Sequence, residues 1–400
     1  MGLCGSYDQG RIEGHCGVCE CSLRGGYATR MSWWSPLAAT PITTPRARMH
    51  SLVIAVGVFG MLMTWPELVC AQHGNYVLGT LGLFGGAQAP EGIYYQNIFS
   101  YYHSSNSGIL EATRARDLTV FGRQLGLTVN AAFNAKSSMD VYIDQNIIGM
   151  TTPFKILGAN YGFMIDIPFD NAHGTGDASL DVGADLRGLF DRNFTAGASV
   201  ARSRSGTADF NIADLYVEAI NLGWHFPQLD VLATMGFFAP TGAYSANRVI
   251  NNGLGRWAEM FGMGAVGYLD RARSWSISAM TRYLTHQSQQ GVDIRVGDDF
   301  ILEWGLGKTF RPPAWKPWVT QLDTGVIGYA QWQLTDNRGS AIPIPLRRIR
   351  SNIFGVGPEI ATTTKFGRFF ARYEFEFGAQ NSPQGHIFLF GLALLYDPFK

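Results

Sequence analysis

The residues best placed to do chemistry are charged side chains at alternate positions of an aromatic segment. The segment is 368–378, and its charges are Arg368, Arg372, Glu374 and Glu376, with Phe370 among them. Successive side chains of a β-strand point to opposite sides, so these residues share one face and the other face is aromatic. Such charges can pair across strands and stiffen a wall. They can equally line the path of a solute, and both readings remain open.

Residues suited to catalysis or metal binding are scattered. His286 and Ser288 lie close in the chain, but a hydrolase also needs a third group to hold the base beside its nucleophile. Asp298 and Asp299 could bind a divalent cation with other oxygens, or simply open a strand at a wet rim. The sequence therefore predicts no enzyme, no catalytic residue, no metal site and no cofactor.

The same alternation recurs in the segments that would position these charges. Segments 155–169, 273–285, 299–311 and 317–334 each carry apolar residues on one face and polar residues on the other. In an outer-membrane barrel this pattern places lipid outside and a wet lumen inside. The predicted lumen-facing residues are Asp299, Glu303, Gln321, Asp323, Arg368, Phe370, Arg372, Glu374 and Glu376.

Two features favour a membrane barrel over a soluble sandwich. Aromatic residues gather near the ends of the segments, as in the girdles of outer-membrane barrels. The connections also alternate in length. Short connections are expected at 226–229, 270–273, 311–316 and 364–367, and long ones at 241–255, 286–298, 335–348 and 379–385. We predict an all-β fold, a transmembrane antiparallel up-and-down β-barrel, with its long connections outside the cell.

The strand count is expected to be even, because both ends of the barrel should lie in the periplasm. Twelve strands are preferred. Their ranges are 92–103, 139–150, 155–169, 212–225, 230–240, 256–269, 273–285, 299–311, 317–334, 349–364, 367–380 and 385–397. Adding 123–133 and 193–203 gives fourteen. That count would place a long loop at 170–192 on the side of the short turns, so it is less consistent.

The N-terminal part has a different character from the rest. All five cysteines lie within the first 70 residues, and Cys16 and Cys19 have zinc-chelating spacing without a second ligand pair. We interpret 1–48 as an N-terminal extension that reflects an early start codon or a long basic n-region. Residues 49–71 are predicted to be a signal peptide cleaved near Ala71. Residues 72–90 are then a periplasmic segment, and residues 91–400 form the barrel.

Several short motifs resemble one known family. They include Thr152–Gly162, Asp214–Glu218 and Gly355–Pro358, in an order and spacing that cover roughly residues 90–397. The chain resembles the MetA-pathway of phenol degradation family of outer-membrane barrels. The family-motif residues are Asp214, Trp224, Pro240, Thr241, Gly242, Asn252, Trp257, Gly357 and Pro358. The resemblance implies uptake of small hydrophobic, often aromatic, compounds.

The composition limits which partners can be expected. Charged residues make up 16% of the chain and the net charge is zero, which gives no reason to expect nucleic acid as a partner. Expected partners are outer-membrane lipid and lipopolysaccharide, the barrel-assembly machinery and a small hydrophobic solute. Arg347, Arg348 and Arg350 could bind lipopolysaccharide phosphates. We expect a passive channel in the cell outer membrane; the alternative is a narrow or plugged barrel with a structural or surface-interaction role.

Overall fold

The computed structural model describes residues 75–120, 123–189, 192–312, 318–342 and 344–399. The predicted N-terminal extension, the signal peptide, the Cys16–Cys19 pair and residues 72–74 lie outside the described residues. Within the described parts, no helix is long and apolar enough to cross a membrane.

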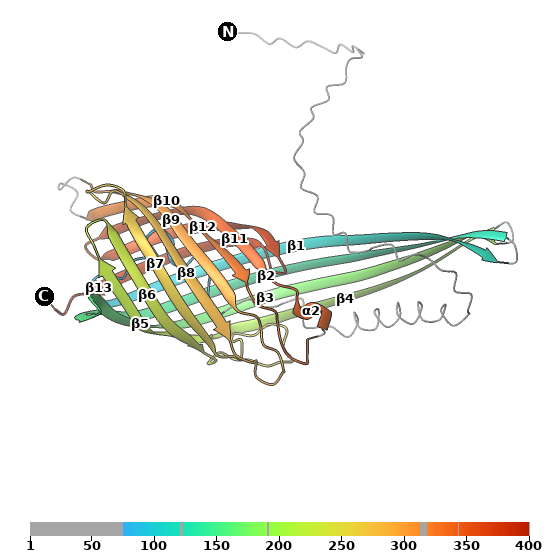
Figure 1. The fold of residues 1–400 in the computed structure, drawn as a ribbon, viewed down its shortest axis with the longest axis horizontal. Coiled ribbons are helices and arrows are strands. Elements are labelled where there is room, and N and C mark those ends of the chain that lie inside the picture. Colours follow the sequence, from blue (N-terminus) through green and yellow to red (C-terminus); the bar gives the residue numbers. More distant parts are fainter. Residues whose placement is uncertain (1–74, 121–122, 190–191, 313–317, 343, 400) are drawn as a thin grey trace, which may run out of the picture. The chain divides into compact units, whose positions relative to one another are not determined.

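The strands of the described residues form one antiparallel sheet that closes on itself (Figure 1). Their bounds are β1 Gly92–Val120, β2 Arg123–Ile156, β3 Ala159–Leu189, β4 Arg192–Ile212, β5 Leu215–His225, β6 Leu229–Ala239, β7 Ala258–Tyr268, β8 Trp275–His286, β9 Asp299–Phe310, β10 Val319–Gln333, β11 Asn352–Thr364, β12 Gly367–Gln380 and β13 Gly385–Tyr396. Strands β1–β3 and β5–β13 form a ring that the β1–β13 and β2–β3 pairings close. The predicted twelve-strand antiparallel barrel is confirmed.

The pairing of β4 shows why the fourteen-strand count is wrong. β4 pairs with the far part of β3, from Phe169 onward, and β5 pairs with the near part, between Asn160 and Asp166. β4 and β5 therefore follow one another along the same edge of β3 and occupy one wall position. The segment 123–133 is likewise the far part of β2, not a separate wall strand.

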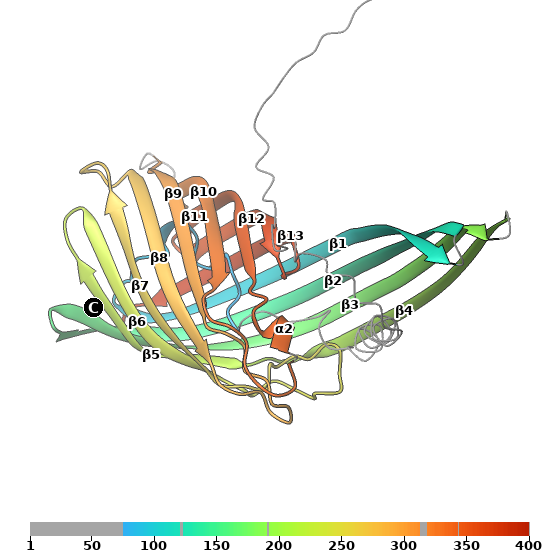
Figure 2. The same cartoon turned by 45° about the vertical axis from the view of Figure 1, so that its right-hand side comes forward.

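The first four strands also run well beyond the barrel (Figures 1 and 2). β13 pairs with β1 only from Ile93 to Ser104, whereas β2 stays paired with β1 as far as Val120. We call the four-stranded part formed by residues 105–120, 123–138, 171–189 and 192–208 the extension. The segment 170–192, a loop in the fourteen-strand count, lies in β3: its Gly, Asp and Asn residues are typical of a connection, but β2 and β4 pair with both edges of this segment.

The two ends of the barrel differ in their connections. One end, which we call the turn end, carries the connections 157–158, 226–228, 269–274 and 365–366, together with the start of β1 and the end of β13. The opposite end, the loop end, carries 240–257, 287–298 and 334–351, the last with the short helix α2 Ile344–Arg347. The predicted alternation is confirmed, except that only residues 381–384 separate β12 from β13.

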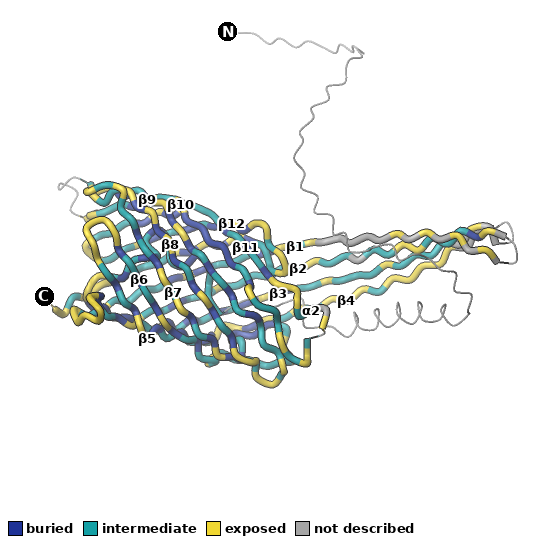
Figure 3. The backbone as a smooth tube through the Cα atoms, in the orientation of Figure 1, coloured by how far each residue is buried: buried dark blue, intermediate teal, exposed yellow. Residues whose placement is uncertain are grey.

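Burial alternates along the wall strands (Figure 3). In β12, Arg372, Glu374 and Glu376 are buried, whereas Phe375 and Phe377 are each 44% exposed. Soluble proteins bury aromatic side chains and expose charged ones, so this wall has the reverse polarity. Its outer surface is apolar, and its charged side chains face the interior of the ring.

Candidate functional site in the barrel lumen

A chain segment that precedes β1 fills the barrel interior. Residues 75–91, which we call the lumen segment, include the short 3-10 helix η1 Gly82–Phe84 and contact inward residues of β3, β5, β9, β11 and β12. Leu83 is fully buried, against the glycines of β9 and β10. The prediction of a periplasmic segment at 72–90 is therefore wrong for residues 75–90. This glycine-rich backbone lies inside because wall carboxylates accept its N–H groups.

Three charged wall side chains hold the lumen segment. Glu303 accepts hydrogen bonds from the Tyr76 hydroxyl and the Gly79 N–H, each at 2.7 Å. Glu359 accepts from the Leu83 N–H at 2.9 Å. Arg372 donates from Nε to Glu359 at 2.9 Å and from Nη1 to the carbonyl of Thr80. Bonds to charged groups are roughly twice as strong as neutral ones, so the segment is gripped by polar contacts.

Two glycines of the lumen segment make this close approach possible. Gly79 and Gly82 have φ angles of +78° and +67°, which other residues rarely adopt. A Cβ at Gly79 would lie 1.8 Å from Oε2 of Glu374, and one at Gly82 would lie 2.1 Å from Oε2 of Glu359. Both positions therefore require glycine for conformation and for space.

Glu374 and Arg282 are the least satisfied charged groups of the lumen. Glu374 is fully buried, and neither of its carboxylate oxygens has a hydrogen-bond partner among the described residues. The Arg282 guanidinium lies 4.2 Å from the ring centroid of Tyr76 and 4.0 Å from Glu303. Burying an unpaired charge costs free energy. The lumen segment covers these side chains, so filling the lumen is unfavourable for them.

The other predicted lumen-facing residues lie on either side of the contacts that hold the lumen segment. Nearer the turn end, Asp323 binds Arg368 and accepts hydrogen bonds from Thr309 and Gln321. Glu376 accepts from Tyr329 at 2.7 Å and Tyr102 at 3.0 Å. Phe370 packs in a buried apolar cluster with Tyr329 and Leu389. Asp299 lies at the loop end, 3.1 Å from Nε2 of His286.

The interior is strongly acidic. Among the described residues, eleven carboxylates are buried, against three arginines. Sequence reasoning missed Glu218 and Glu359; it assigned Arg282 to the polar face of 273–285 but did not include it among the predicted lumen-facing residues. Arg282 and Glu359 alternate with apolar neighbours, which was a usable signal. Nothing local marked the lumen segment itself, because this glycine-rich stretch with scattered apolar residues follows neither a strand nor a helix period.

The residues considered for catalysis and for metal binding do not come together as either kind of site would require. His286 is buried against Asp299, while Ser288 is exposed in the following loop. Asp298 accepts hydrogen bonds from Tyr283 and Thr285 instead of facing other carboxylates. Within the described ranges, no three His, Cys, Asp or Glu side chains come together in a way that could hold a metal ion.

Four of the family-motif residues meet where the loop-end connection 240–257 folds over the lumen. Asp214 accepts hydrogen bonds from the N–H groups of Gly242, at 3.1 Å, and Leu254, at 2.8 Å. Thr241 binds the backbone of Ala213 and Leu215 through its hydroxyl. Asn252 donates to Asp170 and to the carbonyl of Asp209. These residues fold a cap, and Pro240 starts it directly after β6.

The remaining motif residues are spread over the wall. Trp257 is 45% exposed beside Phe237, and Trp224 donates to the Leu157 carbonyl at the turn end. A Cβ at Gly357 would lie 1.7 Å from the Tyr373 carbonyl, so β11 approaches β12 closely just before Pro358. The family motif therefore marks folding positions and not one site.

A buried arginine lies under the cap. Arg256, in the 240–257 connection, is 3% exposed, and neither its Nε nor its Nη2 has a partner among the described residues. Burial lowers the pKa of Arg256 to about 10, although Asp299 and Asp214 oppose the shift. The guanidinium remains charged at neutral pH, which places one fixed positive charge at the mouth of an acidic lumen.

Comparison with known proteins gives a family and several distant structures. The family model described as "Putative MetA-pathway of phenol degradation" matches residues 124–390. The COG4313 outer membrane channel from Pseudomonas putida F1 is 12% identical with a TM-score of 0.47, covering 80% of this chain and all of that one. A Pseudomonas aeruginosa FadL homologue is 10% identical with a TM-score of 0.28, covering 76% of this chain and 90% of that one.

No curated protein matches the chain. The family model, in contrast, spans well over half of it, including most of the ring, the cap and the wall residues that hold the lumen segment. The chain belongs to the family described as the MetA-pathway of phenol degradation.

Proposed function

We propose that the protein is an outer-membrane channel for passive uptake of small hydrophobic or aromatic compounds, closed in this structure by the lumen segment. The observation that carries the proposal is the filling of the ring. Small barrels fill their interior with wall side chains, whereas here a separate stretch of backbone occupies the lumen and is held by hydrogen bonds. Such a filling can leave without unfolding the wall.

The membrane setting rests on the outer surface of the ring. Phe99, Ile165, Phe261 and Phe390 are exposed side chains from different wall strands. A contiguous apolar belt with aromatic residues is the lipid-facing surface of an outer-membrane barrel. Together with the predicted signal peptide, this supports the cell outer membrane as the location. Lipid, lipopolysaccharide and the barrel-assembly machinery are then the proposed partners.

The solute class rests on the family description and on the wall itself. Phe370 and Tyr329 offer aromatic contacts among the charges of the inner surface. A neutral aromatic molecule could use both kinds of contact without leaving a charge unpaired. Predicted functional residues for this path are the lumen-facing set named from the sequence, with Glu303 and Arg372 controlling access.

The hydrogen bonds that join Glu303, Glu359 and Arg372 to the lumen segment favour a second candidate, a plugged barrel with a structural or surface-interaction role. Two measurements separate the candidates. A deletion strain should take up labelled aromatic solutes more slowly than its parent at low external concentration, and complementation should restore the rate. Unchanged uptake of aromatic, aliphatic and small polar solutes, with no conductance of the purified barrel in planar bilayers, would establish the plugged barrel.

Orientation can be tested separately. The loop end should face the cell exterior, because outer-membrane barrels place their long connections there. The mature chain after residue 71 contains no cysteine, so single introduced thiols report cleanly. Gln290→Cys at the loop end should react with an impermeant thiol reagent in intact cells, and Ala272→Cys at the turn end should not. Both sites are exposed, so labelling at Ala272→Cys alone would invert the topology.

A further inference from the structure

The lumen segment does not satisfy all the polar groups that it covers. Glu374 is fully buried, and a Cβ at Gly79 would lie 1.8 Å from its Oε2 atom. This carboxylate thus faces a glycine whose N–H is donated to Glu303 instead. On β8, the hydroxyls of Ser276 and Ser278 are also buried without a partner among the described residues. The polar groups of the wall therefore suit a different occupant better than they suit this segment.

Two carboxylates at the centre of the lumen are paired with arginines of the wall. Nε of Arg372 donates to Glu359 at 2.9 Å, and Nη1 of Arg282 lies 4.0 Å from Oε2 of Glu303. All four residues belong to wall strands, so these pairs persist when the lumen segment withdraws. Each pair has no net charge, so neither arginine is left to balance another carboxylate.

Glu374 and Glu376 keep a negative charge that no arginine balances. They lie two residues apart on β12, so their side chains point to the same side. Among the described residues, Glu376 accepts only from neutral donors, the Tyr329 and Tyr102 hydroxyls and the N–H of Gly385. Burial disfavours the charged form of a carboxyl group, and water that enters an open lumen removes this cost. The centre of the open lumen is therefore negatively charged.

Aromatic rings lie beside these two carboxylates. Tyr329, which donates to Glu376, packs with Phe370 in a buried cluster. The guanidinium of Arg372 lies 4.2 Å from the centroid of the Phe370 ring, so the wall already holds one organic cation against an aromatic face. A carboxylate forms charge-assisted hydrogen bonds with an ammonium group, and an aromatic ring attracts the same cation through its π face. Together they suit a small molecule that carries both an ammonium group and an aromatic ring.

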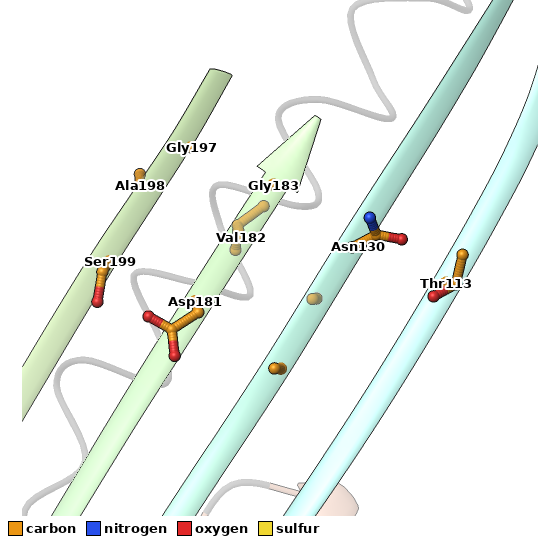
Figure 4. Close-up of a pocket in the computed structure, with 10 residues that line it drawn as sticks. Thr113, Asn130, Asp181, Val182, Gly183, Gly197, Ala198 and Ser199 are labelled. Carbon is orange, nitrogen blue, oxygen red and sulfur yellow. The ribbon is translucent and has the colours of Figure 1, made fainter. Parts of the chain in front are cut away.

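The extension carries a hollow but no comparable set of groups. This hollow, of about 730 Å³, lies along strands β1–β4, with Asn130, Asp181 and Ser199 among the residues that line it (Figure 4). All three of these residues are exposed, so water satisfies their polar groups. Glu374, in contrast, is enclosed and has no partner among the described residues.

We propose that Glu374, with Glu376 beside it, binds the ammonium group of small aromatic amines once the lumen segment withdraws, so that the open channel favours cationic over anionic aromatic molecules. This inference rests on the proposed channel function and narrows its solute class. A cleft lined by one sign of charge concentrates ions of the opposite sign, and acidic side chains select cations in channels. The eleven buried carboxylates, against three arginines, extend the same field along the lumen.

The test compares labelled solutes of similar size that differ in charge: benzylamine, which carries an ammonium group at pH 7, benzyl alcohol and benzoate. Barrel-dependent uptake is the uptake at low external concentration that a deletion strain lacks. In wild-type cells it should be about tenfold faster for benzylamine than for benzyl alcohol, as expected for one hydrogen bond to a charged group, and slowest for benzoate. Glu374→Gln keeps the shape and removes the charge, so it should remove this preference for benzylamine.

Glu259→Gln is the matched control. It removes the same charge from the outer side of β7, where Glu259 accepts a hydrogen bond from Gln287, and the preference for benzylamine should not change. Both variants are first checked for the heat-modifiable mobility of a folded barrel. If folded Glu374→Gln keeps the preference and benzyl alcohol uptake still depends on the barrel, the amine site is wrong and the channel stands.

Competition in wild-type cells tests the charge preference without any variant. Unlabelled benzylamine should inhibit the barrel-dependent uptake of labelled benzyl alcohol at a concentration about tenfold lower than unlabelled benzoate requires. Equal inhibition by the amine and the acid would overturn the preference for cations while the channel stands. Absence of barrel-dependent uptake for all the solutes would instead overturn the channel function, and the amine site with it.

Discussion

Replacing Gly79 and Gly82 together by alanine is expected to open the barrel. Both residues adopt left-handed backbone angles, and an added Cβ would clash with Glu374 and Glu359. The backbone cost alone is about 1–2 kcal/mol at each position. A released lumen segment escapes this cost, so the ratio of open to closed barrels should rise by roughly 30- to 700-fold.

The measurement is single-channel conductance in planar bilayers, compared with the wild-type barrel. Gly291→Ala is the matched control, because Gly291 also has a positive φ, of +73°, but lies in a loop with open space around it. That control should conduct like the wild type. A double variant that folds normally and conducts no more than the wild type would show that the lumen segment is a permanent part of the wall.

Phe390→Arg is expected to destabilise the inserted barrel strongly. Phe390 is 56% exposed and lies near the middle of β13, opposite Phe99 on β1 and Ala371 on β12. An arginine at this depth faces lipid, which costs ~2–4 kcal/mol at the bilayer midplane. The measurement is the urea midpoint of the barrel folded into liposomes, followed by its heat-modifiable mobility in gels.

Two control variants test whether the loss of stability depends on where the new charge lies, both its depth in the membrane and the side of the wall that it faces. Phe366→Arg introduces the same residue in the turn between β11 and β12, where Lys365 already lies near Trp318, and should cost ~0–1 kcal/mol. Glu374→Gln changes an inward residue whose carboxylate has no partner among the described residues, and should leave stability unchanged or raised. Equal losses in Phe390→Arg and Phe366→Arg would contradict the lipid-facing assignment.

Most of the fold could be predicted from two features of the sequence: the alternation of polar and apolar residues and the lengths of the connections. A strand whose two sides meet different solvents must repeat with a period of two, and this local signal identified the wall segments and the count of twelve. The pattern could not show how far a strand continues. β1, β2 and β3 extend beyond the ring because neighbouring strands pair with them there.

The sequence by itself indicated which face of each wall segment is polar and which is apolar, because successive side chains of a strand alternate between its two surroundings. Only the tertiary structure decided what fills the lumen. Gly79 and Glu303 are 224 residues apart in the chain, and no local pattern links a glycine-rich segment to carboxylates on distant strands. The same holds for the cap, where Asp214 meets Gly242 and Leu254 across a folded loop. These contacts satisfy backbone groups by joining residues that are far apart in the chain, so no local pattern in the sequence predicts them.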